Sequence, residues 1–106
     1  MANTYKNVKI DLNTTNNTVL YTCPAKTTAI VKSILISEDS NNASTITVSL
    51  TAGASVFSMF FEKAISAKQS VELLSSPVII NTTEILKAQA GNADRIHVIA
   101  SILEIT

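Results

Sequence analysis

The residues with the most potential for catalysis are a single histidine and a single cysteine, His97 and Cys23. Nucleophilic catalysis needs a nucleophile, a base and a third group that orients the base. His97 stands inside an apolar run, Cys23 directly precedes Pro24, and neither position provides that third group. We therefore expect Cys23 to be a small core-facing side chain and His97 to be a polar residue on the outer face of a strand. The sequence predicts a protein that is not an enzyme.

Metal and phosphate sites also lack their usual residue patterns. Glu38 and Asp39 are the one adjacent pair of carboxylates, and Ser40, Asn41 and Asn42 follow them. A calcium site needs oxygen ligands at alternating positions around a glycine-bearing turn. The run 38–42 lacks that spacing, so we expect a solvated hairpin tip. A lone cysteine cannot form a cysteine metal cluster or an intrachain disulfide. We predict no metal and no cofactor.

The charge pattern argues against two classes of partner. Eight basic and eight acidic residues give a formal net charge of zero, and the lysines are scattered along the chain. Nucleic-acid binding normally needs a basic excess on one face, so none is expected. No apolar run approaches the roughly 18 residues that span a bilayer, so no membrane partner is expected. The N-terminal residues lack the apolar core of a signal peptide, which predicts folding in the cytoplasm.

The residue types favour β structure. Ser, Thr and Asn make up about a third of the chain, and Ile and Val about a fifth. β-Branched side chains suit a pleated, half-buried surface, whereas Ser and Asn favour turns. Along 44–51, Ile46, Val48 and Leu50 alternate with hydroxyl residues, the pattern of a strand with one buried face. Residues 5–12 alternate in the same way, and 27–37 is apolar on both sides, as in a central strand.

Eight or nine short strands follow one another at spacings of about ten residues. That pattern predicts an all-β fold, an antiparallel β-sandwich of the jelly-roll or immunoglobulin-like type. The length of 106 residues predicts one sandwich domain over residues 1–106, with residues 1–4 as an extended N-terminal arm.

The closing segment, residues 95–105, is apolar on both faces. Ile96, Val98, Ala100 and Ile102 form one face, and the opposite face carries the residues Ile99, Leu103 and Ile105. A strand with two apolar faces must be covered twice, once by the core and once by a loop, the N-terminal arm or a neighbouring subunit. We therefore expect Ile99, Leu103 and Ile105 to contact a partner.

Two aromatic residues are added to the predicted interface. Phe57 and Phe61 share strand parity with Met59 and are expected in the core, whereas Phe60 has the opposite parity and is expected to anchor an interface. Tyr5 is the best-placed aromatic for an open binding groove, although an ordinary strand tyrosine is the simpler explanation.

The order of these segments resembles that of small β-sandwich virion proteins of tailed bacteriophages. The resemblance rests on four segments: 19–34 (VLYTCPAKTTAIVKSI), 41–50 with its T-V-S-L strand, 73–80 with its P-V-I run, and the last strand, 96–105. It covers most of the chain from Val19 onward. The family usually has an acidic Gly-Asp turn after the P-V-I run, and here the residues are Asn81-Thr82-Thr83-Glu84. A ligand role of that turn therefore does not carry over.

The resemblance implies a non-enzymatic structural protein of a phage particle, above all a capsid decoration (cement) protein that stabilises the shell. The implied partners are further copies of this chain, in a homo-oligomer, and a major capsid or other virion protein. The implied location is the virion, assembled in the host cytoplasm. Two alternatives stay open: a neck, tail or fibre component, and a module that binds a receptor or glycan.

Overall fold

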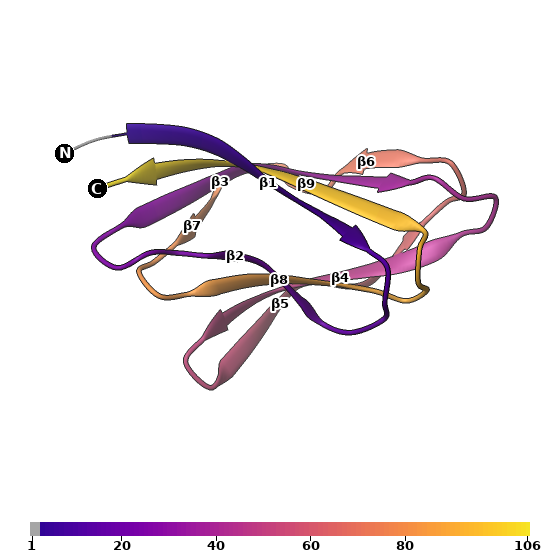
Figure 1. The fold of residues 1–106 in the computed structure, drawn as a ribbon, viewed down its shortest axis with the longest axis horizontal. Helices are drawn as coiled ribbons and strands as arrows, with labels where there is room; N and C mark the ends of the chain where they lie inside the picture. The colour runs from indigo at the N-terminus through magenta and orange to yellow at the C-terminus, as the bar shows by residue number, and fades with distance from the viewer. Residues whose placement is uncertain (1–2) are drawn as a thin grey trace.

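Two antiparallel sheets stack face to face in the computed structural model, which describes residues 3–106 (Figure 1). The nine strands of this part of the chain are β1 (Asn3–Leu12), β2 (Thr18–Thr22), β3 (Thr28–Glu38), β4 (Ser44–Ala52), β5 (Ser55–Ile65), β6 (Ser70–Glu72), β7 (Val78–Ile80), β8 (Ile85–Ala90) and β9 (Ile96–Ile105). No helix of residues 3–106 is long and apolar enough to cross a membrane. The prediction of an all-β antiparallel sandwich is confirmed.

The strand order identifies the sandwich as a jelly roll. Sheet A has the order β1-β9-β3-β6, with β7 also paired to β3, and sheet B has the order β2-β8-β4-β5. Apart from the β4–β5 hairpin and the β6–β7 link, every connection crosses from one sheet to the other. This winding of two Greek keys is the jelly-roll arrangement. The edges of the sandwich are therefore β1 and β2 on one side, and β5, β6 and β7 on the other.

The core lies between the sheets and follows the alternation of the strands. On β9, the inward residues Ile96, Val98, Ala100 and Ile102 are fully buried. On β4, Ile46 and Val48 face them from sheet B. Burial of each such Ile or Val stabilises the fold by about 1.5–3 kcal/mol relative to an exposed position. The central strand β3, paired on both sides, adds Val31, Ile34 and Ile36.

The expectation that Phe57 and Phe61 lie in the core is wrong, because β5 does not keep a simple alternation. Between the pairs Ile46–Lys63 and Val48–Phe60, β5 has one residue more than β4, and Glu62 there has a φ of +50°. This bulge leaves Phe61 exposed. Phe57 is exposed near the end of the β4–β5 hairpin, which projects away from sheet A in Figure 1.

One edge of sheet A is a split strand that a carboxylate holds in place. β6 pairs with residues 35–37 of β3 and β7 pairs with residues 29–31. In the gap between them, the Glu72 carboxylate accepts hydrogen bonds from the Ser33 hydroxyl, from the Ile34 amide at 2.8 Å and from the Leu74 amide at 3.1 Å. Burial alone would raise the pKa of Glu72, but these hydrogen bonds outweigh it and lower the pKa below its usual value.

Two other expected features differ from the structure in detail. Asn3 and Thr4, expected in the N-terminal arm, lie in β1 opposite Ile105 and Glu104, and the rest of that arm lies outside the described residues. Glu38, expected at a solvated hairpin tip, is only 1% exposed. Its carboxylate is turned inward, and the Ser40 amide donates to its Oε1 at 2.5 Å.

Candidate interaction surface

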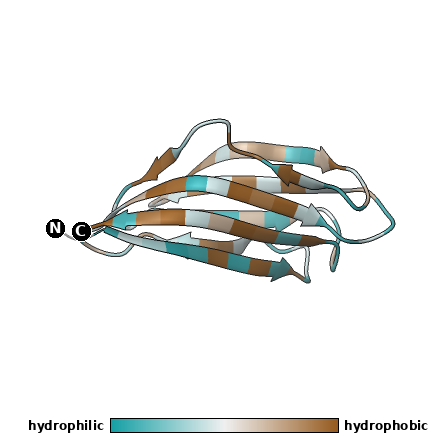
Figure 2. Cartoon of the chain, turned by 90° about the horizontal axis from the view of Figure 1, so that it is seen from above, coloured by the Kyte–Doolittle hydropathy of each residue, from teal (hydrophilic) through white to brown (hydrophobic). Residues whose placement is uncertain are grey.

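An apolar row crosses the outer face of sheet A from one edge to the other. In the register of the sheet, Leu103 of β9 lies between Tyr5 of β1 and Ile30 of β3, and Ile79 of β7 lies beyond Ile30. We call these four residues the outer row. Figure 2 looks onto this sheet and shows hydrophobic residues on each of its long strands. The row exists because large apolar side chains occupy outward positions that are in register on four strands.

The two ends of the outer row are open to solvent and its middle is covered. Tyr5 is 75% exposed and Ile79 is 58% exposed, whereas Leu103 is 8% exposed. Leu103 is buried without belonging to the core cluster between the sheets, as expected for a residue shielded by its neighbours on the outer face. Its side chain is therefore part of the surface layer and not freely available to a partner.

A second apolar pair lies on the same face, four residues from Leu103 along β9. Ile99 of β9 lies directly opposite Leu35 of β3, and both are exposed. Lys9 lies beside Ile99 on β1, and Glu72 lies beside Leu35 on β6, so the pair has a positive charge on one side and a negative charge on the other. Ile105, at the end of β9, is half-buried between Asn3 and Thr28. An apolar centre with a charged rim is the usual anatomy of a protein-protein contact.

Shallow depressions at the two ends of this face carry its polar groups. One is lined by Tyr5, Asn7, Lys32 and Ser101. The other contains His97, whose Nε2 lies 3.3 Å from Asp11 Oδ1 and whose Nδ1 lies 3.4 Å from Asp39 Oδ2. His97 is thus a polar residue on the outer face, as expected, and each of its ring nitrogens lies close to a carboxylate oxygen.

Four of the five predicted interface residues share this face: Tyr5, Ile99, Leu103 and Ile105. Phe60 is not among them. It lies on β5 of the other sheet, is half-buried, packs against the core and lines a depression with Met59 and Leu74. The sequence reasoning missed Ile30, Leu35 and Ile79. The apolar run 27–37 signalled the first two, whereas Ile79 joins the row only through the pairing of β7 with β3.

The cysteine and the histidine lie at opposite ends of the sandwich. The Cys23 thiol donates to the carbonyl oxygens of Thr27 at 3.3 Å and Ile80 at 3.5 Å, near the C-terminal end of β9. His97 lies at the start of β9. Burial raises the pKa of the Cys23 thiol above its ordinary value, which disfavours the reactive thiolate. No three His, Cys, Asp or Glu side chains of residues 3–106 are grouped so that they could hold a metal ion.

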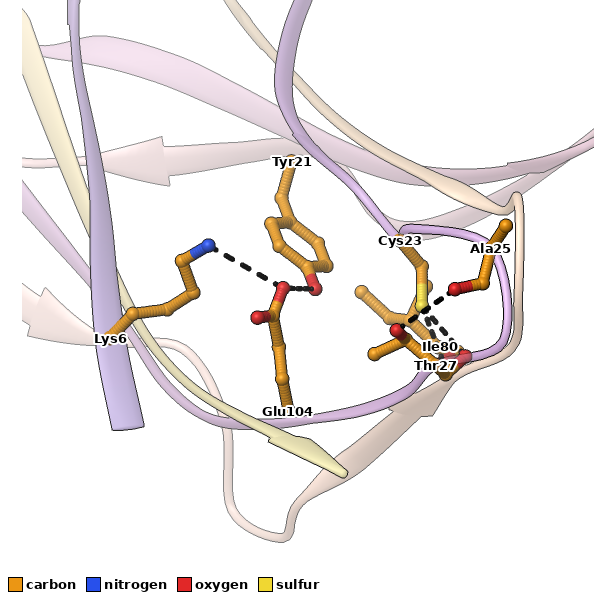
Figure 3. A network of polar contacts seen from close by, with 7 residues as sticks. All are labelled: Lys6, Tyr21, Cys23, Ala25, Thr27, Ile80 and Glu104. Carbon is orange, nitrogen blue, oxygen red and sulfur yellow. Dashed lines mark hydrogen bonds and ion pairs between the residues drawn. The ribbon is translucent and has the colours of Figure 1, made fainter. Parts of the chain in front are cut away.

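A polar network ties the two sheets together at the end near Cys23 (Figure 3). The Tyr21 hydroxyl of sheet B donates to Glu104 Oε2 of sheet A at 2.5 Å, and Lys6 Nζ lies 3.5 Å from the same oxygen. Burial, followed by the contact with Glu104, raises the pKa of Tyr21 far above its ordinary value. The polar groups of these side chains contact one another, so the network has a structural role and is not an open binding site.

Comparison with solved structures identifies similar folds. The chain aligns with the crystal structure of a pentameric capsid protein isolated from metagenomic phage sequences, with a TM-score of 0.52 and 17% sequence identity over 92% of this chain. A second such structure, solved by iodide phasing, gives a TM-score of 0.48 and 18% identity over 92% of this chain. This chain spans 59% and 60% of the two proteins, less than two thirds of their length. No family model matches the sequence, and a search of curated proteins finds no match. The chain thus has a fold seen in a phage capsid protein.

Proposed function

We propose that this chain is a non-enzymatic structural subunit of a phage particle, and that it acts as a capsid decoration protein. The observation that carries the proposal is the outer face of sheet A, with its apolar row and the Ile99–Leu35 pair. In a monomer, the exposed side chains of these apolar residues stay in contact with water, whereas a shell subunit buries them on assembly.

The jelly-roll fold supports this proposal without proving it, since one fold serves many functions. The fold is shared with a capsid protein of a phage. The zero net charge adds support, because copies packed densely on a shell would repel one another if each carried a large charge. A decoration protein that binds many equivalent shell sites stabilises the assembled form by mass action.

In this proposal the outer face of sheet A is the surface that contacts the capsid. Ile99 and Leu35 are the contact residues, because they are exposed near the middle of the face. Lys9 and Glu72 at either side set the orientation through charge, since rim charges affect specificity more than affinity.

A second candidate function is a subunit of the shell itself. The similar structure is that of a pentameric capsid protein, and the alignment covers nearly all of this chain. In that case the particle could not form without this chain, whereas a decoration protein binds a shell that is already closed.

The experiment that tests the proposal is binding to particles that lack this protein. Purified chain is mixed with such particles, and bound protein is measured by co-sedimentation. Saturable binding at a fixed ratio to the coat protein, with a raised particle melting temperature, is expected. Failure to obtain particles without this chain would favour the shell-subunit function. Normal particles that bind none of it would overturn both functions.

A further inference from the structure

Lys32 lies on an inner strand of sheet A and reaches the outer face of that sheet. The register of β3 against β9 shifts between Val31 and Ser33, so Lys32 is an extra residue in its strand. A bulge of this kind redirects the side chain of the extra residue. Lys32 is exposed and lines the shallow depression that also contains Tyr5 and Ser101. A lysine therefore stands near the middle of the face that the proposed function assigns to the capsid.

Apolar side chains of the outer face lie on both sides of Lys32 along β3. Ile30, a member of the outer row, comes two residues before it. Leu35, which pairs with Ile99, comes three residues after it. A coat protein that covers both the outer row and the Ile99–Leu35 pair therefore covers Lys32 as well, and removes water from around its ammonium group.

Lys32 has no acidic partner of its own once that water is gone. No carboxylate within residues 3–106 lies at ion-pair distance from it. Glu72, in the gap beside β3, is already held by one hydroxyl and two backbone amides, and Glu104 is paired with Lys6. Covering a charged ammonium without a counter-charge carries a large free-energy cost. The anion that offsets this cost must therefore come from the protein that covers the face.

The other polar groups around Lys32 suit a carboxylate. The depression is lined by the Asn7 amide and the Ser101 hydroxyl, and no carboxylate is part of that lining. Lys9 Nζ lies 3.2 Å from Asn7 Oδ1, so the oxygen of this amide is occupied and its NH₂ group is left to donate. An ionised carboxylate only accepts hydrogen bonds, and it binds most strongly to charged donors. The depression is therefore complementary to a carboxylate in both charge and hydrogen bonding.

We propose that the depression around Lys32 receives an acidic side chain of the coat protein, whose carboxylate pairs with the Lys32 ammonium inside the capsid contact. The inference rests on the proposed function, and it specifies the chemistry that the outer face of sheet A requires of its partner. The apolar residues on either side exclude water from the pair, and the pair fixes the orientation of the chain on the shell.

Carbodiimide cross-linking tests this pair directly, because the reagent joins an amine to a neighbouring carboxylate as an amide and takes up the water that is lost. The purified chain is bound to particles that lack it, treated with the carbodiimide and digested, and the linked peptides are identified by mass spectrometry. Lys32 is expected to be linked to an Asp or Glu of the coat protein. Lys63, an exposed lysine on β5 of the other sheet, is the matched control and should form no link to the coat protein.

Substitutions of Lys32 separate an ion pair from simple packing of its aliphatic stem. Lys32→Gln and Lys32→Met should each weaken particle binding about 30-fold or more, since each leaves the coat carboxylate covered without its cation. Lys32→Arg, which keeps the charge, should retain most of the binding, and Lys63→Gln should bind like the parent chain. Because Lys32 is exposed in the free chain, all of these variants are expected to keep the circular dichroism and melting temperature of the parent.

The outcomes distinguish this inference from the proposed function. Undiminished binding by Lys32→Met would show that only the aliphatic stem matters and that the ammonium stays in water. That result, or saturated particles on which Lys32 links to no coat carboxylate, would overturn the inference and leave the proposed function intact. A parent chain that binds no particles would overturn both.

Discussion

The Tyr21 hydroxyl and the Glu104 carboxylate join the two sheets, at an O···O distance of 2.5 Å. Tyr21 comes from β2 of sheet B, and Glu104 comes from the inward face of β9 in sheet A. Lys6 of β1 closes the group from the edge (Figure 3). Tyr21, Glu104 and Lys6 therefore form a polar clasp at one end of the jelly roll, between sheet B and β9, the strand that contributes Leu103 to the outer row.

Loss of this clasp should weaken the fold measurably. Tyr21→Phe leaves the partly buried carboxylate of Glu104 without its strongest donor. This change is expected to lower the free energy of unfolding by about 1–2 kcal/mol. The measurement is urea denaturation followed by circular dichroism.

Tyr5→Phe is the matched control for the clasp, since the Tyr5 side chain is exposed. A surface change of this kind should alter the free energy of unfolding by less than about 0.5 kcal/mol. Equal effects of Tyr21→Phe and Tyr5→Phe would show that the clasp contributes nothing.

The stability of the fold should fall at alkaline pH. Burial raises the pKa of both Tyr21 and Cys23 in the folded chain, so each group stays protonated there after its unfolded counterpart has lost its proton. Above the unfolded values of about 9 for cysteine and 10 for tyrosine, the unfolded state gains from ionisation and the folded state does not. Urea midpoints should therefore decline from about pH 9 upward. The decline should be shallower in Tyr21→Phe, and an unchanged slope in that variant would contradict the role of Tyr21.

The split edge strand should lose stability at acid pH. The pKa of Glu72 is lowered in the folded chain. Its contribution is therefore fully present above the unfolded value of about 4.3 and is lost as the pH falls through the folded value. Glu72→Gln is expected to cost less than about 1 kcal/mol at pH 7, because the side chain is exposed. Below about pH 4, the difference between Glu72→Gln and the parent chain should shrink. A difference that does not depend on pH would assign the effect to packing alone.

Substitutions at exposed positions on the outer face of sheet A should weaken particle binding without weakening the fold. Ile99→Asp and Leu35→Asp are expected to abolish binding to particles that lack this protein, while thermal stability stays close to that of the parent, because both side chains are exposed. Leu103→Asp is expected to destabilise the fold by about 2 kcal/mol or more, since it buries an unpaired charge among the outer-row side chains. Undiminished particle binding by Ile99→Asp would exclude this face as the capsid contact.

Local alternation explains what could be predicted of the fold. On β9 the inward residues are those that the alternation indicated. On β4 the prediction is confirmed for Ile46 and Val48, whereas Ser49 and Thr51, expected on the solvent face, are buried and Leu50 is half-buried. Residues 27–37 are apolar on both sides because one face of β3 packs in the core, while the other contributes Ile30 to the outer row and Leu35 to the pair with Ile99. These features depend on neighbours in sequence, which is why they could be inferred.

Features that depend on pairing between distant strands were not predictable. The extra residues of β5 reverse the positions of Phe60 and Phe61, and they arise from how β5 pairs with β4. The outer row likewise depends on register. Leu103 was identified because both faces of β9 are apolar, whereas Ile79 joins the row only because β7 pairs with β3. The burial of Glu38 likewise involves distant segments, since its amide donates to the Gln69 carbonyl and the next amide, of Asp39, donates to the Arg95 carbonyl.

The most direct test of a virion role is a cryo-electron microscopy map of the parent particle. We expect copies of this sandwich at equivalent positions on the shell, with Ile99 and Leu35 covered by coat protein. Density for this chain that is absent from the shell, or present with the outer face of sheet A turned to solvent, would contradict that role.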